Sequence, residues 1–138
     1  MRFETSFRPS MPEAVVDASA LIDLLLGEAL GEAVAARLAG HQLHVPAHTD
    51  AEALSALARL HRAGELDADA VETMLAYLAA APLERHPVSE LLPGAWARRQ
   101  RLRLADALYV ELAASLSLRL VTTDSRLGSL PLVDVVER

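Results

Sequence analysis

The chain has 138 residues, of which 52% are hydrophobic, and this composition suits one globular domain with a packed core. It contains no cysteine, which excludes disulfides, thiolate metal sites and cysteine nucleophiles. Its 13 basic residues are all arginine, which argues against lysine-dependent P-loops, Schiff-base enzymes and response-regulator receiver domains. The formal net charge of −6 disfavours a purely electrostatic nucleic-acid binder, so a nucleic-acid partner would need a local basic patch or metal ions.

The ends and the hydropathy of the chain bear on where it acts. No stretch approaches the ~20 apolar residues that cross a membrane, and the first dozen residues have no apolar signal-peptide region. We therefore expect a cytoplasmic protein without a membrane segment. Residues 1–12 are interpreted as a disordered N-terminal extension, with Met11 as an alternative start, and residues 13–138 as the domain.

Short apolar runs alternate with longer segments of helical periodicity. The expected strands are Val15–Val16, Leu43–Val45, Leu83–His86, Arg119–Thr123 and Leu132–Val136. The expected helices follow Asp17 up to Leu26 and then cover Glu28–Leu38, Ala47–His61, Asp67–Ala80, most of the segment from Pro87 to Arg103, Leu102–Ala113 and a short turn at Ser125–Gly128. This alternation predicts an α/β fold: a single domain with a mostly parallel central sheet of four or five short strands, flanked by helices.

Four carboxylates recur where strands end or helices begin. Asp17 and Asp124 each end an expected strand, and Glu52 and Asp106 lie in first turns of helices. Each has a local interpretation, because acidic residues cap helix N-termini, and Thr49 to Glu52 reads as a capping box. The carboxyl ends of parallel strands share one edge, however, and ligands bind at that edge in open α/β sheets.

If the four acids meet, protons or cations must neutralise their repulsion. Oxygen-only ligands suit Mg²⁺ or Mn²⁺ better than zinc, which prefers histidine or cysteine. A divalent ion held by carboxylates activates water and offsets charge on a phosphoryl group. The pattern thus favours metal-assisted hydrolysis of phosphodiester bonds.

The same residues resemble a known family. The run from Val15 to Ile22, Glu52 on its leucine-bearing helix, the run from Ala105 to Val110, and Val121 to Asp124 are together similar to a PIN domain, and more narrowly to VapC-type toxins of toxin–antitoxin pairs. The resemblance extends over nearly the whole chain from about Glu13. It implies a Mg²⁺- or Mn²⁺-dependent endoribonuclease that leaves a 5′-phosphate and a 3′-hydroxyl.

The resemblance also implies roles and partners. Asp17, Asp106 and Asp124 would bind the metal, Glu52 would complete the catalytic set, and Ser19 and Thr122 would orient the ligands. The implied partners are an RNA substrate, a small neutralising antitoxin and a second copy of the chain in a homodimer.

Several other features have open interpretations. Arg98, Arg99, Arg101 and Arg103 form either a solvated helix face or a phosphate-contacting rim, in which Arg101 and Arg103 are the candidate RNA contacts. The five histidines show no recognised metal spacing and are interpreted as surface or structural residues, with His48 as a candidate base. Asp23 is expected to face solvent, and Trp96 to lie in the core or an interface.

A non-enzymatic alternative remains at this point. The acids could be helix caps only, and the apolar helices of a catalytically inert PIN-like module could bind a partner instead of RNA.

Overall fold

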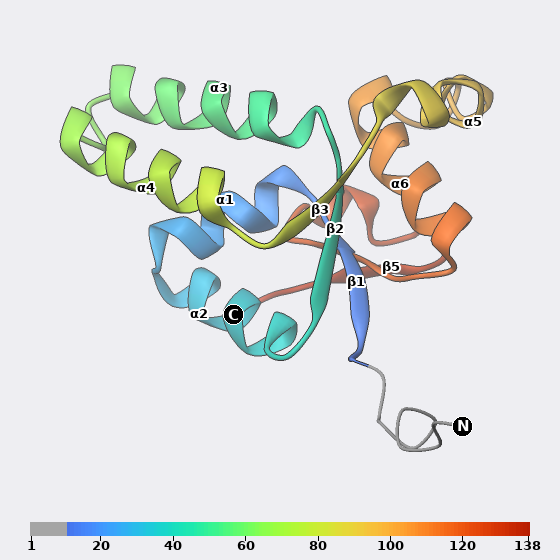
Figure 1. The fold of residues 1–138 in the computed structure, drawn as a ribbon, viewed down its shortest axis with the longest axis horizontal. Coiled ribbons are helices and arrows are strands. Elements are labelled where there is room, and N and C mark those ends of the chain that lie inside the picture. Colours follow the sequence, from blue (N-terminus) through green and yellow to red (C-terminus); the bar gives the residue numbers. More distant parts are fainter. Residues whose placement is uncertain (1–10) are drawn as a thin grey trace, which may run out of the picture.

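The computed structural model describes residues 11–138, so the proposed extension at residues 1–12 lies almost wholly outside it. Five strands form one sheet in the order β3-β2-β1-β4-β5, and every neighbouring pair is parallel. The strands are β1 (Glu13–Val16), β2 (Gln42–Pro46), β3 (Leu83–His86), β4 (Leu120–Thr122) and β5 (Val133–Val135). The expected α/β fold with a parallel sheet is confirmed (Figure 1).

Six α-helices connect and cover the strands. They are α1 (Ala18–Leu26), α2 (Ala29–Leu38), α3 (Thr49–Arg62), α4 (Ala68–Ala80), α5 (Leu92–Ala97) and α6 (Leu104–Leu116). Within residues 11–138 there are also two 3₁₀ turns, η2 (Val88–Leu91) and η3 (Ser125–Leu127). Among residues 11–138, no helix is both long and apolar enough to cross a membrane.

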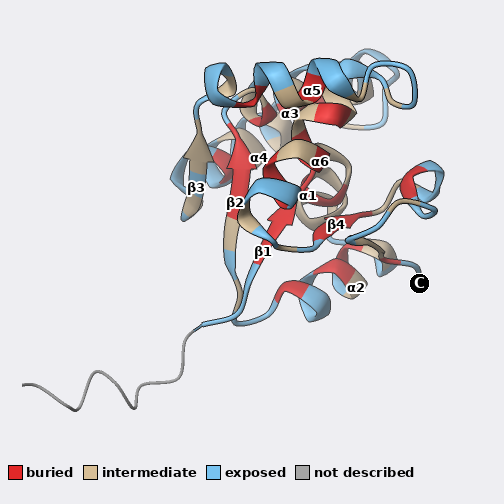
Figure 2. Cartoon of the chain, turned by 90° about the vertical axis from the view of Figure 1, so that its right-hand side faces the viewer, coloured by how far each residue is buried: buried red, intermediate tan, exposed pale blue. Residues whose placement is uncertain are grey.

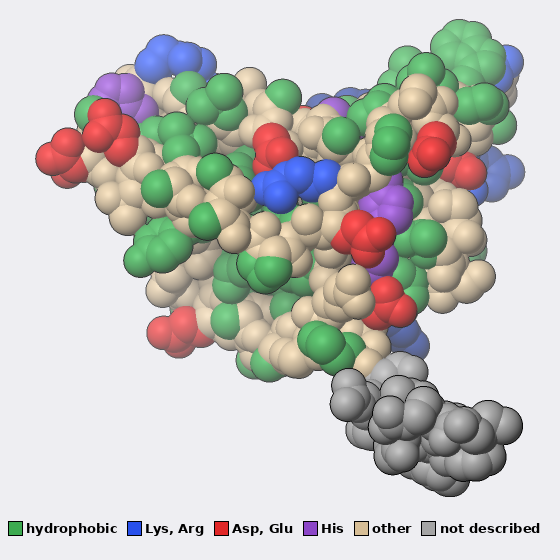
Figure 3. All heavy atoms as spheres, in the orientation of Figure 1, with side chains coloured by type: hydrophobic (Ala, Val, Ile, Leu, Met, Phe, Trp, Pro, Cys, Tyr) green, Lys and Arg blue, Asp and Glu red, His purple; other side chains and the backbone are tan. Residues whose placement is uncertain are grey.

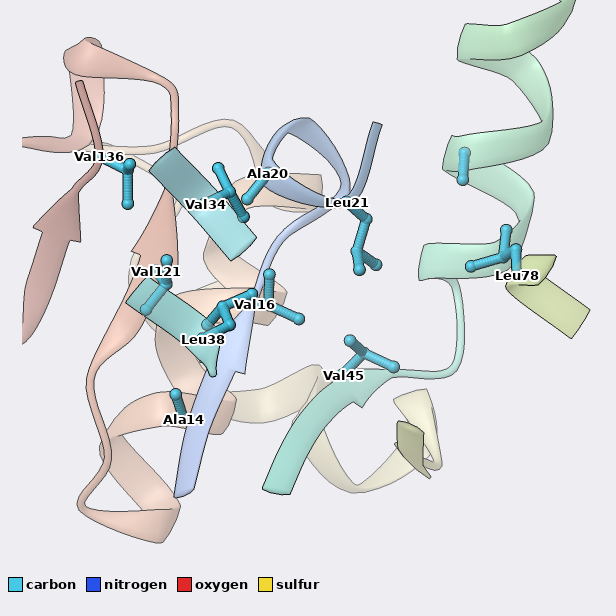
Figure 4. Packing of buried hydrophobic residues seen from close by; sticks show 11 residues of the cluster. Ala14, Val16, Ala20, Leu21, Val34, Leu38, Val45, Leu78, Val121 and Val136 are labelled. Carbon is cyan, nitrogen blue, oxygen red and sulfur yellow. The ribbon is translucent and has the colours of Figure 1, made fainter. Parts of the chain in front are cut away.

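The side chains of the central strands divide between two hydrophobic clusters, one on each face of the sheet. Val16 and Val121 join the cluster covered by α1 and α2, which Figure 4 shows from close by. Val15 and Leu120 join the cluster covered by α6. Adjacent strand residues point to opposite faces, which explains why the short β-branched run is buried on both sides. Figure 2 shows the inner strands as mostly buried and β3, at the edge, as partly exposed.

Two local features fix the helices that follow β1. Gly27 ends α1 in the left-handed conformation, with φ of 70°, which glycine adopts without strain. Gly31 lies so close to α1 that a Cβ there would come 2.1 Å from the Asp23 carbonyl oxygen. The close packing of α1 against α2 therefore depends on the absence of a side chain at Gly31.

The prediction that most of the segment from Pro87 to Arg103 is helical holds for residues 88–97 but not for the last six residues. Helix α5 ends at Ala97, and residues 98–103 form turns, with Leu102 donating its backbone N–H to the Arg98 carbonyl. The chain must reverse here to enter α6, whose N-cap Arg103 is extended with ψ of 145°. The arginine cluster therefore lies on a turn rather than on one helix face.

Candidate active site

All four predicted acids line one cleft of about 440 Å³ at the carboxyl edge of the sheet. Asp17 directly follows β1 and Asp124 follows β4, the neighbouring strand. Glu52 and Asp106 enter from the first turns of α3 and α6. The cleft is also lined by Ser19, Asp23, Arg59, Arg103, Tyr109 and Arg126. The structure thus brings together acids that are up to 107 positions apart in the sequence (124 − 17).

Asp17 is a helix cap and a cleft residue at once. Its Oδ1 accepts hydrogen bonds from the Ala20 N–H at 3.0 Å and from the Ser19 hydroxyl at 2.7 Å. Its Oδ2 accepts from the Thr122 hydroxyl at 2.5 Å. A carboxylate has about four acceptor sites, so one remains for a ligand. The two interpretations of Asp17 are therefore compatible.

The surroundings of Asp17 disfavour the ionised form of its carboxyl group. Only 5% of the residue is exposed, and this burial raises the pKa of the carboxyl group, opposed by the hydrogen bonds from Thr122, Ala20 and Ser19. The nearby charge of Asp106 raises the pKa further. A carboxylate with this environment is stabilised by a cation placed next to it.

Thr122 links two of the acids through its fully buried hydroxyl. The hydroxyl donates to Asp17 and accepts the backbone N–H of Asp124 at 3.0 Å. It also lies 3.2 Å from the Ser19 hydroxyl. The two residues predicted to orient the ligands, Ser19 and Thr122, do contact Asp17 in the structure.

The capping-box interpretation of Glu52 is wrong. His48 is the N-cap of α3 and makes no side-chain capping bond. Glu52 instead turns into the cleft, where its Oε1 accepts from the Tyr109 hydroxyl at 2.6 Å and lies 3.3 Å from His48 Nε2. The His48 ring lowers the pKa of Glu52 most, and Tyr109 lowers it further, against the opposing effect of burial.

Asp106 and Asp124 face arginines. The Arg126 guanidinium binds both oxygens of Asp124, with Nη2 2.5 Å from Oδ2, and this contact lowers the pKa of Asp124 most. The Nε of Arg103 lies 3.7 Å from Asp106. Partial burial raises the pKa of Asp106, and Arg103 and Arg126 oppose that rise. Asp106 makes no capping bond to the start of α6.

The structure places several residues differently from what the sequence predicted. Asp23 accepts from the Thr123 hydroxyl at 2.7 Å and lines the cleft, so the expectation that it faces solvent is wrong. Arg103 lines the cleft as predicted, but Arg101 lines a separate hollow between α6 and β5. Trp96 is 59% exposed and therefore does not lie in the core.

The positions of Tyr109 and Arg126 in the sequence could have indicated that they lie near the cleft. Tyr109 lies three residues after Asp106, about one helical turn along α6, so it lies near a predicted acid. Arg126 lies two residues after Asp124, in the short turn that Asp124 caps. Arg59 lies seven residues after Glu52, two helical turns along the same face of α3.

The donor set fits a hard divalent cation such as Mg²⁺ or Mn²⁺, because it consists of carboxylate oxygens. Within the described residues, however, no three acids of the cleft bring ligand oxygens within 4.8 Å of one another. Arg126 holds Asp124 by both oxygens. An ion that bound Asp124 would therefore compete with Arg126 for its oxygens.

Comparison with known proteins finds relatives over most of the chain. The family model of the PIN domain matches residues 14–131. Ribonuclease VapC3 of Mycobacterium tuberculosis is 53% identical over 123 residues, which cover 87% of this chain and 90% of that protein.

Two solved structures have a similar fold. One is VapC20 of Mycobacterium tuberculosis, a Sarcin-Ricin loop cleaving toxin, with a TM-score of 0.68, 18% identity, and coverage of 90% of this chain and 99% of that one. The other is a toxin-antitoxin complex from Klebsiella pneumoniae, with a TM-score of 0.65, 22% identity, and coverage of 88% and 96%.

Proposed function

Because the chain belongs to the PIN-domain family and, within it, to the VapC ribonucleases, we propose that it is a toxin endoribonuclease. It hydrolyses RNA phosphodiester bonds with the help of a divalent cation held in the acidic cleft. The observation that carries this proposal is the meeting of Asp17, Glu52, Asp106 and Asp124 in one cleft at the carboxyl edge of the sheet. We expect it to act in the cytoplasm, where its RNA substrate is found.

Asp17, Asp106 and Asp124 are the proposed metal ligands, with Mg²⁺ or Mn²⁺ as the ion. The raised pKa values of Asp17 and Asp106 support this assignment, because both carboxylates are disfavoured without a compensating positive charge. When bound, the ion supplies positive charge to the phosphoryl oxygens and makes water more acidic.

Glu52 is the proposed catalytic base. Its carboxylate is ionised at neutral pH and lies in the cleft, and the Tyr109 hydroxyl and the His48 ring fix its direction. Ser19 and Thr122 are positioning residues, since they act on the cleft through Asp17 and the backbone of Asp124. Such supporting contacts typically matter for ligand orientation.

Arginines around the acids are the proposed contacts to the RNA backbone. Arg59, Arg103 and Arg126 all line the cleft, and a guanidinium is suited to bind phosphate through paired hydrogen bonds. This local positive rim explains how a chain with a net charge of −6 can hold a polyanion.

The proposed protein partners rest on the family of the chain rather than on the geometry of the cleft. We propose that a small antitoxin neutralises the chain and that the chain forms a homodimer. Large apolar side chains at the surface support such contacts, for example Tyr77 at 69% and Trp96 at 59% exposure.

The inert-module alternative has weaker support. It requires the acids to be helix caps, and only Asp17 and Asp124 accept capping bonds. Glu52 and Asp106 make none and point into the cleft instead.

The deciding experiment is cleavage of a structured RNA by the purified chain with Mg²⁺, with Mn²⁺ and with EDTA. Cleavage should require the ion and leave 5′-phosphate ends, and Asp17→Asn and Asp106→Asn should each abolish it. Asp67→Asn is the matched control, because Asp67 caps α4 through the Ala70 N–H but does not line the cleft. Equal cleavage in EDTA, or full activity of Asp106→Asn, would contradict the proposal.

A further inference from the structure

A second group of ionisable side chains lies on the first three strands, and none of its members lines the acidic cleft. Glu13 comes from β1, His44 from β2, and Glu84 and His86 from β3. Figure 3 shows histidine and acidic side chains gathered over this part of the surface. His44 pairs in register with Glu84, and His86 lies two residues further along β3, so both β3 residues share a face.

Within this group, His44 makes contacts through both ring nitrogens. Its Nε2 lies 2.7 Å from Glu13 Oε1. Its Nδ1 lies 2.9 Å from His86 Nε2 and 3.5 Å from Glu84 Oε2. In the neutral state, His44 donates through Nε2–H to Glu13, which leaves the Nδ1 lone pair facing His86 and Glu84.

We propose that His44 Nδ1, His86 Nε2 and a Glu84 oxygen bind a zinc ion at this place. In the part of the chain that the structure describes, these are the only three His, Asp or Glu residues whose ligand atoms all lie within 4.8 Å of one another. Zinc bonds of ~2.0–2.1 Å in tetrahedral geometry put neighbouring ligand atoms ~3.3 Å apart. The observed separations of 2.9 and 3.5 Å bracket that value.

The surroundings of the three ligands match those of a zinc site. The Glu13 carboxylate accepts the N–H at Nε2 of His44, the nitrogen that does not face the zinc. A carboxylate is a usual hydrogen-bond partner of a zinc-bound histidine, and it fixes the tautomer of the ring. Gln42 Nε2 donates to Glu84 at 3.3 Å and orients its carboxylate. His86 needs only to carry its proton on Nδ1 instead of Nε2 to become a ligand.

The donor atoms of this group and its exposure to solvent favour Zn²⁺ over the Mg²⁺ or Mn²⁺ proposed for the acidic cleft. Two imidazoles and one carboxylate are a zinc donor set, whereas Mg²⁺ prefers oxygen ligands. The Glu84 side chain is 53% exposed, while that of His44 is only 6% exposed. The ion can therefore enter from solvent, and a fourth position stays open for water.

Zinc at this position would tie the edge strand β3 to β2 and, through Glu13, to β1. Because the ligands are brought together only in the folded sheet, binding stabilises the folded state. The proposal does not depend on the ribonuclease activity, and its test does not use cleavage.

The test is a zinc titration followed by calorimetry, together with the visible absorption of the Co²⁺-loaded protein. The wild-type chain should bind one Zn²⁺ that excess Mg²⁺ does not displace, and Co²⁺ should give the intense absorption of a tetrahedral site. His86→Gln and Glu84→Gln should each weaken Zn²⁺ binding at least about tenfold, and Glu13→Gln about 10–100-fold. His41→Gln is the control, because the His41 ring lies against the Ala39 carbonyl and does not belong to this group.

The outcomes separate this site from the acidic cleft. Asp106→Asn should leave Zn²⁺ affinity and the Co²⁺ spectrum unchanged. Binding that is lost in Asp106→Asn but kept in Glu84→Gln would overturn the proposal, as would equal affinities of His86→Gln and His41→Gln. Glu84 is exposed on an edge strand, so Glu84→Gln is informative even if a histidine variant does not fold.

Discussion

The Tyr109 hydroxyl donates a 2.6 Å hydrogen bond to Glu52 and thereby joins α6 to α3 across the acidic cleft. Tyr109 is only 2% exposed. Its pKa is raised strongly by burial and by the Glu52 carboxylate, so the phenol stays protonated and remains a donor. The His48 ring packs against it with a centroid separation of 4.9 Å. Glu52 is therefore held by the buried Tyr109 ring and the half-buried His48 ring rather than by a capping bond to the backbone of its own helix.

Tyr109→Phe tests this contact. Removing the hydroxyl should raise the pKa of Glu52, lower the free energy of unfolding by about 1 kcal/mol, and slow RNA cleavage about tenfold at saturating substrate. Tyr77→Phe is the matched control, because Tyr77 is 69% exposed on α4. Thermal melting and the pH profile of the cleavage rate are the measurements. An unchanged pH profile would mean that the hydroxyl does not hold Glu52.

Thr122→Val tests the buried link between Asp17 and Asp124. Valine has nearly the same shape, but it cannot donate to Asp17 or accept the Asp124 N–H. We expect the affinity for Mg²⁺ to fall about 10–100-fold, measured by the Mg²⁺ dependence of cleavage and of the melting temperature. The half-buried loop residue Thr123 is not a suitable control, because its hydroxyl donates to Asp23. Thr73→Val on α4 is preferable, since its hydroxyl bonds only the Asp69 carbonyl.

Arg126→Ala tests whether an arginine competes with the metal for Asp124. The Arg126 guanidinium holds both Asp124 oxygens, so its removal should strengthen Mg²⁺ binding several-fold. The same change removes a cleft arginine and should raise the KM for RNA. Arg119→Ala, at the exposed residue just before β4, should change neither quantity. Weaker Mg²⁺ binding in Arg126→Ala would show that Arg126 positions Asp124 instead of competing for it.

The sheet was predictable because most of its strands are short apolar runs closed by polar or proline residues. Leu83–His86 has only one apolar residue but ends at Pro87, and it was predicted with its observed bounds. The other strands differ by one or two residues at their ends. The segment 98–103 was mispredicted because arginine favours helices, whereas the reversal between α5 and α6 is set by tertiary packing. Local preference could not reveal that reversal.

The acids of the cleft were predictable because parallel strands bring their carboxyl ends to one edge. The directions of their side chains were not, as Glu52 shows: its local pattern indicated a capping box, but Tyr109, 57 residues away, determines where it points. The pairing of His44 with His86 was missed for a related reason. It depends on the register between β2 and β3, which spacing along the sequence does not reveal.

Asp17→Asn should stabilise the metal-free chain at neutral pH. The pKa of Asp17 in the folded state is raised above its unfolded value of ~3.9, so the folded state binds this proton more tightly. The stability due to Asp17 is therefore greatest at low pH and is lost as the pH rises through the raised pKa. Asparagine keeps the cap and removes the buried charge.

The measurement is the difference in melting temperature between Asp17→Asn and the wild type in EDTA, from pH 4 to pH 8 in steps of about one unit. The difference should grow with pH and reach a few degrees, or about 1 kcal/mol, at neutral pH. Asp124→Asn should show the opposite sign, because Arg126 lowers the pKa of Asp124 and the stability from that pair is present at neutral pH and lost on acidification. Excess Mg²⁺ should reverse the order of wild type and Asp17→Asn.

The two arginines predicted to contact RNA are separated by the structure, and this separation gives a paired test. Arg103 lines the acidic cleft with its Nε 3.7 Å from Asp106, whereas Arg101 lines the hollow between α6 and β5. Arg103→Ala should raise the KM for RNA about tenfold, as expected for the loss of one phosphate contact of ~1–2 kcal/mol. It should also flatten the dependence of cleavage on salt concentration, because one fewer counterion is released. Arg101→Ala should leave both quantities near wild type. A loss in Arg101→Ala as large as that in Arg103→Ala would place the RNA across the turn at residues 98–103 rather than along the cleft alone.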